Sequence, residues 1–262
     1  MELGNSLAIA MKDMREVFTS VSIFGPMLGV PLFFALFLPV LTFYVSAHAA
    51  PALASRLFSI ALPVAASSAK SINSASFMAF FSIYVLGPIF LTMPILTASV
   101  IAADSFVGEK ERKTAEALFS TPVKNSELLL GKMLASLLPT ILLTLGVFAI
   151  YGAITDYLSF SSFGVYVLPT LPWLMLLLIS PFLAIVTIGI VIIVSSHVKG
   201  TKEAQQISTL LVLPVLILPF ASITGFALLT ASLLFYIALL LAAIGAIVVY
   251  ASIRTFNKEA II

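Results

Sequence analysis

The chain has 262 residues, of which 61% are hydrophobic and 9% are charged, with a formal net charge of +2. A soluble domain carries about 25% charged residues because its surface contacts water, so this composition excludes a soluble globular protein and predicts an all-α integral membrane protein. The small basic excess is typical of membrane topology signals and not of nucleic-acid binding. Without cysteine, the chain has neither disulfides nor thiol ligands for zinc.

Residues 1–20 predict an amphipathic helix that does not cross the membrane. Apolar residues recur along it every three or four positions, at Leu3, Leu7, Met11, Met14 and Phe18. The charged side chains avoid this stripe, as in helices that lie in the membrane interface. We therefore expect an interfacial helix on the cytoplasmic side, and the alternative is a soluble helix packed on another chain.

Six apolar segments follow that are long enough to span a bilayer. A helix needs about 20 apolar residues to cross roughly 30 Å of hydrocarbon, and such segments lie at about 21–45, 76–103, 132–153, 166–194, 206–222 and 225–252. The fifth is short and contains Pro214 and Pro219, so residues 219–230 could instead form a re-entrant element. We expect a single transmembrane domain, residues 1–262, whose proline-kinked helices pack as a bundle.

The positions of the basic residues predict the orientation of these spans. With the N-terminus inside, eleven of the thirteen Lys and Arg residues fall in cytoplasmic segments, and only Arg56 and Lys70 fall outside. Cytoplasmic loops carry an excess of Lys and Arg. We therefore expect a multi-pass protein of the cell membrane with both termini in the cytoplasm, an extracellular loop at 46–75 and a cytoplasmic loop at 104–131.

The sequence predicts no catalytic, cofactor or metal site in this chain. None of its eleven acidic residues is expected near the middle of the bilayer, where proton-coupled transporters place them, and Asp104 lies at the inner end of the second span. His48 and His197 fall on opposite sides of the membrane, so they cannot share a metal ion. No complete phosphate-binding loop occurs either. The chain is therefore not expected to hydrolyse ATP by itself.

The cytoplasmic loop contains the strongest concentration of charge, in the stretch FVGEKERKTAEALFSTPVKNSELLLGK at 106–132. Glu109 precedes Lys113 by four residues and Arg112 precedes Glu116 by four, a spacing that supports a helix over 109–119. Pro122 ends this helix. A loop that only sets topology needs basic residues, whereas this one also has acids at helical spacing and an apolar face. We therefore expect it to dock on a protein, and the alternative is a solvated loop that only sets topology.

The same stretch resembles the signature of the ABC-2 type transporter permeases, the membrane subunits of ATP-binding-cassette exporters. The match is specific because many residues agree at fixed spacing, namely Glu109, Lys110, Glu111, Thr114, Glu116, Leu118, Thr121, Pro122, Glu127, Leu128, Leu129, Gly131 and Lys132. At lower specificity the resemblance covers the whole chain, including the amphipathic start, the six spans and the charged end.

The resemblance implies a fold and a mechanism. The fold would be that of the ABC-2 permeases, in which residues 1–20 form a connecting helix and 109–119 a coupling helix seated on a separate ATPase subunit. ATP and Mg would bind to that ATPase, and a working exporter would contain two ATPase chains and two permease chains, identical or different. The expected ATPase contacts are Glu109, Lys110, Glu111, Arg112, Thr114, Glu116, Leu118 and Phe119, and residues 199–206 form a weaker second contact.

Two other functions fit the same features. A membrane sensor or assembly scaffold could dock an ATPase through the same helix without transporting anything. An enzyme acting on lipid is the third reading, and Asp104 is the only acid near a span that could serve its chemistry. For a transporter, spans that offer hydroxyl groups but no buried charge favour an amphiphilic or hydrophobic substrate.

Overall fold

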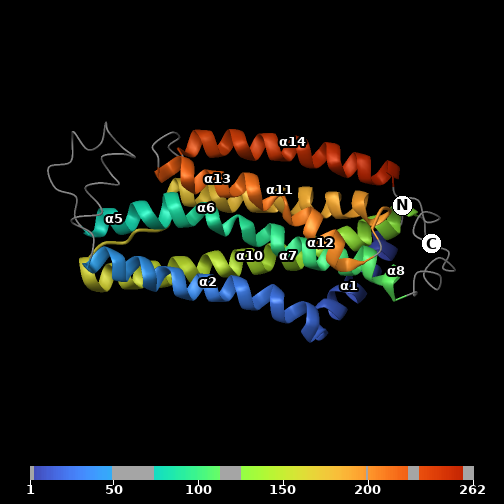
Figure 1. The fold of residues 1–262 in the computed structure, drawn as a ribbon, viewed down its shortest axis with the longest axis horizontal. Coiled ribbons are helices and arrows are strands. Elements are labelled where there is room, and N and C mark those ends of the chain that lie inside the picture. The colour runs from blue at the N-terminus through green and yellow to red at the C-terminus, as the bar shows by residue number, and fades with distance from the viewer. Residues whose placement is uncertain (1–2, 49–73, 113–124, 199, 224–229, 256–262) are drawn as a thin grey trace.

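The computed structural model describes residues 3–48, 74–112, 125–198, 200–223 and 230–255, and within these ranges every regular element is a helix (Figure 1). The described residues contain six helices long and apolar enough to cross a membrane, which are Met27–His48, Ser74–Glu111, Ser126–Phe163, Leu171–Ser195, Thr201–Ser222 and Ala231–Arg254. The prediction of an all-helical chain with six spans is confirmed. The chain is a multi-pass membrane protein.

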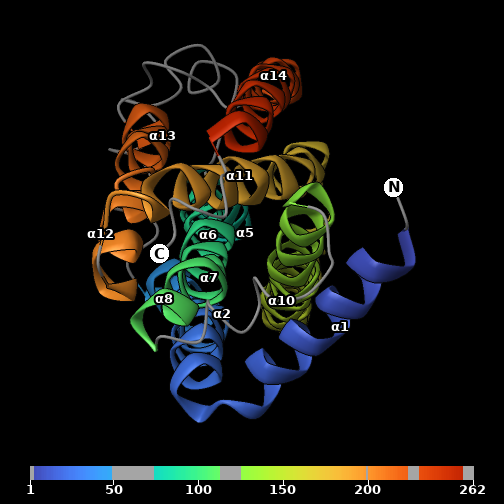
Figure 2. The ribbon, with the colours of Figure 1, turned by 90° about the vertical axis from the view of Figure 1, so that its right-hand side faces the viewer.

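The chain begins with α1 (Leu3–Thr19), which crosses α10 obliquely before the first span, α2 (Val21–His48) (Figure 2). Helix α1 buries a narrow face that includes Ser6, Ala10 and Val17. Most of the apolar stripe predicted from the sequence points away from the bundle, and Leu7 and Met11 are 56% and 66% exposed. The helix is therefore amphipathic as predicted, but its contact with the bundle uses small side chains next to the stripe.

The second span lies at the centre of the bundle. It runs continuously through α5 (Ser74–Phe80), a π-helical turn (Phe81–Leu86), α6 (Gly87–Phe90), α7 (Thr92–Ala103), a second π-helical turn (Asp104–Gly108) and α8 (Glu109–Glu111). The most apolar 18-residue segment of this span is 83% buried, whereas the corresponding segment of the last span is 17% buried. Figure 2 shows α6 and α7 surrounded by α2, α10, α11 and α13. The second span therefore packs against most of the bundle.

Helix α10 (Asn125–Phe163) is the longest helix described and extends beyond the predicted span of 132–153 at both ends. It contains Pro139 and ends before Gly164, which has a positive φ of 68°. The Asp156 carboxylate accepts hydrogen bonds from the backbone N–H groups of Val167 (2.9 Å) and Leu168 (2.8 Å). This polar residue thereby ties the connection after α10 back onto the helix.

The fourth span, α11 (Leu171–Ser195), joins α10 to the second span through an aromatic cluster. The rings of Phe90, Phe148, Tyr151 and Trp173 are buried together, and the centroids of Phe90 and Tyr151 lie 4.5 Å apart. The Tyr151 hydroxyl donates to the backbone carbonyl of Ser82, 3.3 Å away in the first π-helical turn. The core of the bundle is thus built from helices that are distant in the sequence.

The last part of the chain contains α12 (Thr201–Thr209), α13 (Val212–Ile223) and α14 (Ala231–Thr255). Helices α12 and α13 together form the fifth span, and they are separated at Leu210 and Leu211 because Pro214 has no N–H group to donate to the Leu210 carbonyl. Helix α14 packs mainly on α11, where Ser252 donates to the Gly189 carbonyl at 3.1 Å. The re-entrant element considered for 219–230 includes residues 224–229, outside the described part of the chain.

Candidate functional site

The candidate site lies at one end of the bundle, here called the charged end, where α1, α8, α12 and the first turns of α10 meet (Figures 1 and 2). The helix of the second span does not stop at 103 but continues through the second π-helical turn to Glu111, and α10 already begins at Asn125. The described residues of the predicted loop, 104–112 and 125–131, are therefore mainly helix ends. Of the predicted coupling helix, only 109–112 belong to the described residues, so Thr114, Glu116, Leu118 and Phe119 lie outside them.

Glu109 forms an ion pair with Lys132 of α10, in which Nζ lies 2.6 Å from Oε2. The Lys132 side chain is 3% exposed, also donates to the backbone carbonyl of Ser105, and lies 5.6 Å from the centre of the Phe106 ring. Removing one partner of a buried ion pair costs of the order of 3–5 kcal/mol, because the other charge is left in a medium of low dielectric constant. Glu109 and Lys132 therefore fix the end of the second span to α10.

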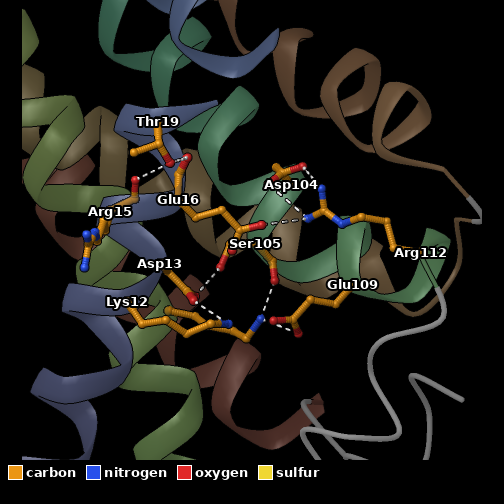
Figure 3. A network of polar contacts seen from close by, with 10 residues as sticks. Lys12, Asp13, Arg15, Glu16, Thr19, Asp104, Ser105, Glu109 and Arg112 are labelled. Carbon is orange, nitrogen blue, oxygen red and sulfur yellow. Dashed lines mark hydrogen bonds and ion pairs between the residues drawn. The ribbon is translucent and has the colours of Figure 1, made fainter. Parts of the chain in front are cut away.

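Arg112 joins the end of the second span to α1. Its two terminal nitrogens donate to the two carboxylate oxygens of Asp104, each at 3.3 Å, and Nη2 lies 3.6 Å from Oε1 of Glu16 (Figure 3). Burial alone would lower the pKa of Arg112, but its hydrogen bonds to Asp104 and the charges of the neighbouring acids raise that pKa above its ordinary value. The guanidinium group is therefore held between two helices as a permanent cation.

Glu111 contacts a third element, the N-terminus of α12. Its Oε2 accepts a hydrogen bond from the backbone N–H of Thr201 at 3.0 Å. The residue at the N-cap position, Gly200, has no side chain that could accept this bond. A carboxylate is favoured at a helix N-terminus because the first N–H groups lack partners within the helix. Glu111 therefore serves as the cap of α12 from another part of the chain.

Asp13 and Ser105 complete the contact between α1 and the second span. The Ser105 hydroxyl donates to Oδ2 of Asp13 at 3.2 Å, and Lys12 Nζ lies 3.4 Å from Oδ1 (Figure 3). Beside them is a cavity of about 20 Å³ lined by residues of α1, α10 and the second span, which is large enough for one water molecule. Asp13 is only 6% exposed, although the sequence pattern predicted that it faces water.

The structure thus places the four described site residues in different surroundings. Glu109, Glu111 and Arg112 each contact a separate element of the same chain, and Lys110 is half-buried. Sequence reasoning missed Asp13, Glu16 and Lys132 as members of this network. Helical spacing identified neighbours along one helix, and it carries no signal for partners on another helix.

A family model described as "ABC-2 family transporter protein" matches residues 7–237. The chain belongs to the ABC-2 transporter family. The match begins within α1 and ends within α14, so it includes every element of the charged end. Comparison with curated proteins gave no match. Membership of the ABC-2 family implies association with an ATP-binding-cassette ATPase.

Proposed function

We propose that this chain is the permease subunit of an ATP-binding-cassette exporter, in which a separate ATPase subunit docks on residues 109–119 and hydrolyses ATP. The observation that carries this proposal is the family match over 7–237, which spans the amphipathic helix and the membrane helices of one bundle. The segment proposed for docking continues directly from the most buried helix of that bundle. Movement of a docked ATPase would therefore reach the centre of the permease.

The proposed assembly contains two permease chains and two ATPase chains, with both termini of each permease in the cytoplasm. The distribution of Lys and Arg supports this orientation. Large apolar side chains are exposed on α2, α13 and α14, among them Phe33, Ile217 and Ile247 at 57%, 63% and 67%. These faces suit contact with lipid or with the second permease chain.

The proposed substrate is amphiphilic or hydrophobic. Among the described residues, the polar side chains buried between the middle parts of the spans are hydroxyls such as Thr97, Thr140 and Thr187, and the buried charges lie at the charged end. Hydroxyl groups bind neutral polar groups but do not stabilise a dehydrated ion as a counter-charge does. Transport of a small inorganic ion by the reconstituted complex would contradict this choice of substrate.

The function is tested by purifying a tagged permease from its native membrane in mild detergent at low salt. We expect an ATP-binding-cassette ATPase, identified by mass spectrometry, to co-purify, and its turnover in liposomes to depend on the permease. The double variant Glu116→Ala/Leu118→Ala is expected to lose this ATPase. Arg254→Ala, a change at the same end of the bundle on α14, is the matched control and is expected to retain it.

The outcomes separate the proposal from its alternatives. If no ATPase accompanies the wild-type chain, the permease function is contradicted. If an ATPase binds but its turnover is the same with and without the permease, the chain is a scaffold that docks an ATPase without transporting anything.

A further inference from the structure

We propose that Glu109, Glu111 and Arg112 form an intramolecular clamp, which fixes the end of the second span to α10, α12 and α1. In this role they are positioning residues for ATP-driven movement and not contacts to the ATPase. The inference rests on the proposed function and deepens it, because it assigns three charged residues of the docking segment to transmission within the permease and leaves docking to the rest of 109–119. The clamp comprises these three residues and their partners Lys132, the Thr201 N–H group, Asp104 and Glu16.

Helix geometry directs the three side chains to different neighbours. Successive residues of an α-helix are turned by about 100°, so residues at 109 and 112 share one side and residue 111 points the opposite way. The contacts agree with this arrangement, because Glu109 and Arg112 reach α10 and α1, while Glu111 reaches α12. Figure 2 shows α1 and α10 on one side of α8 and α12 on the other. One turn of helix thus holds three elements.

The contacts of Glu109 leave little of its side chain for a partner protein, whereas the Arg112 side chain is 47% exposed and is held by its ion pairs. Lys132 is 3% exposed and only 2.6 Å from the Glu109 carboxylate, whose own side chain is 17% exposed. Breaking such a pair to contact another chain would strand a buried ammonium group. Both terminal nitrogens of Arg112 are already directed at Asp104, and one also faces Glu16.

The local backbone is adapted to the Asp104–Arg112 pair. A Cβ atom at Gly108 would lie 2.9 Å from Asp104 Oδ1 and 3.0 Å from Arg112 Nη2, so a larger residue there would displace the ion pair. Asp104 and Gly108 are the first and last residues of the second π-helical turn, where an extra residue per turn changes the direction of the side chains. The second π-helical turn therefore brings Asp104 and Arg112 together at the end of the second span.

The clamp predicts that docking and transmission can be separated by mutation. The complex of permease and ATPase is reconstituted in liposomes with one of three single variants, Glu109→Gln, Glu111→Gln or Arg112→Gln. Each is expected to bind as much ATPase per permease chain as the wild type. Permease-dependent ATPase turnover is expected to fall about tenfold, within the range of allosteric coupling between protein sites. The swapped pair Glu109→Lys/Lys132→Glu is expected to restore most of the turnover that Glu109→Gln loses. Arg254→Gln is the control expected to leave both quantities unchanged.

The clamp is also measured without any ATPase. Glu109→Gln, Lys132→Met and the double variant form a thermodynamic cycle, read from thermal unfolding of the purified permease in detergent. We expect each single change to lower the midpoint and the double change to lower it by clearly less than the sum. If the two single changes in midpoint simply add up in the double variant, the clamp is contradicted. This result is independent of whether the wild-type chain recruits an ATPase.

Two further results would overturn the inference while leaving the proposed function intact. One is loss of the ATPase from folded Arg112→Gln, or from folded Glu109→Gln with no recovery in the swapped pair, which would make that residue a direct contact. The other is unchanged turnover in all three single variants.

Discussion

Gly131 is a residue of α10 against which α1 packs closely. A Cβ atom there would lie 2.8 Å from the backbone oxygen of Ser6 and 2.9 Å from Cβ of Ile9. Neither atom is at the end of a flexible side chain, so the helices would have to separate. Small residues have the same role wherever the backbones of packed membrane helices come together. The glycine of the signature ELLLGK is thus explained by packing within this chain.

The first prediction concerns this crossing point. Gly131→Ala is expected to lower the free energy of unfolding by about 1–3 kcal/mol, the usual effect of overpacking, and to expose α1 to protease in detergent. Gly146→Ala on the same helix is the matched control, because no atom lies within 4 Å of a Cβ atom there. Alanine is the better helix former, so the control is expected to be neutral or stabilising. Equal midpoints for the two variants in thermal unfolding would show that α1 does not rest on Gly131.

The charged residues show what sequence could and could not reveal at this scale. The concentration of charge at 109–112 and its importance were visible, because charges are rare elsewhere in the chain. The partner on another helix was not visible: i,i+4 spacing offered Glu109 only Lys113, which lies outside the described residues, and the structure pairs Glu109 with Lys132 of α10. Spacing along one helix carries no signal for a buried lysine on another helix.

At the scale of elements, the apolar windows predicted the number and type of spans, and the ends of the spans were predicted less well. Helix α10 continues to Phe163, beyond the predicted end at 153, because the polar Asp156 near its end finds partners in the backbone at Val167 and Leu168. The second span continues past 103 because Asp104 and Glu109 are paired. Hydropathy measures the cost of leaving water and contains no information on such tertiary partners.

Helix α1 leads to a prediction about the membrane surface. Met11 is 66% exposed and the neighbouring Lys12 side chain 61%, so within the isolated chain the two are equivalent. If α1 lies in the interface, only the apolar stripe with Met11 enters the lipid. The chain has no cysteine, so Met11→Cys and Lys12→Cys can each carry one environment-sensitive fluorophore. We expect brominated lipids to quench the label strongly at 11 and weakly at 12.

Comparing the two positions shows whether the apolar stripe of α1 lies in the lipid, because both positions belong to one turn of this helix. Equally weak quenching at both positions would place α1 away from the bilayer, packed on another chain. Equally strong quenching would place the whole helix within the lipid, which the charged side chains of Lys12 and Glu16 oppose.

On the scale of the whole molecule, the two ends of the bundle differ in chemistry. One end has the clamp, which joins α1, α8, α10 and α12. The other has exposed aromatic side chains near the turn between α10 and α11, including Tyr157 at 73% and Tyr166 at 66%. Tyrosine is enriched at membrane interfaces because its ring is apolar and its hydroxyl polar. This asymmetry fits a bundle whose charged end faces the cytoplasm.

The final prediction tests this orientation in intact cells. Tyr166→Cys and Lys202→Cys each add one thiol to a chain that has none, at exposed positions near opposite ends of the bundle. A membrane-impermeant maleimide is expected to label Tyr166→Cys in intact cells and Lys202→Cys only after permeabilisation. Eleven of thirteen basic residues lie on the Lys202 side in this topology, and moving them across a bilayer is strongly unfavourable. If instead Lys202→Cys is labelled in intact cells and Tyr166→Cys only after permeabilisation, the clamp lies outside the cell. No cytoplasmic ATPase could reach it there, and the proposed function would be contradicted.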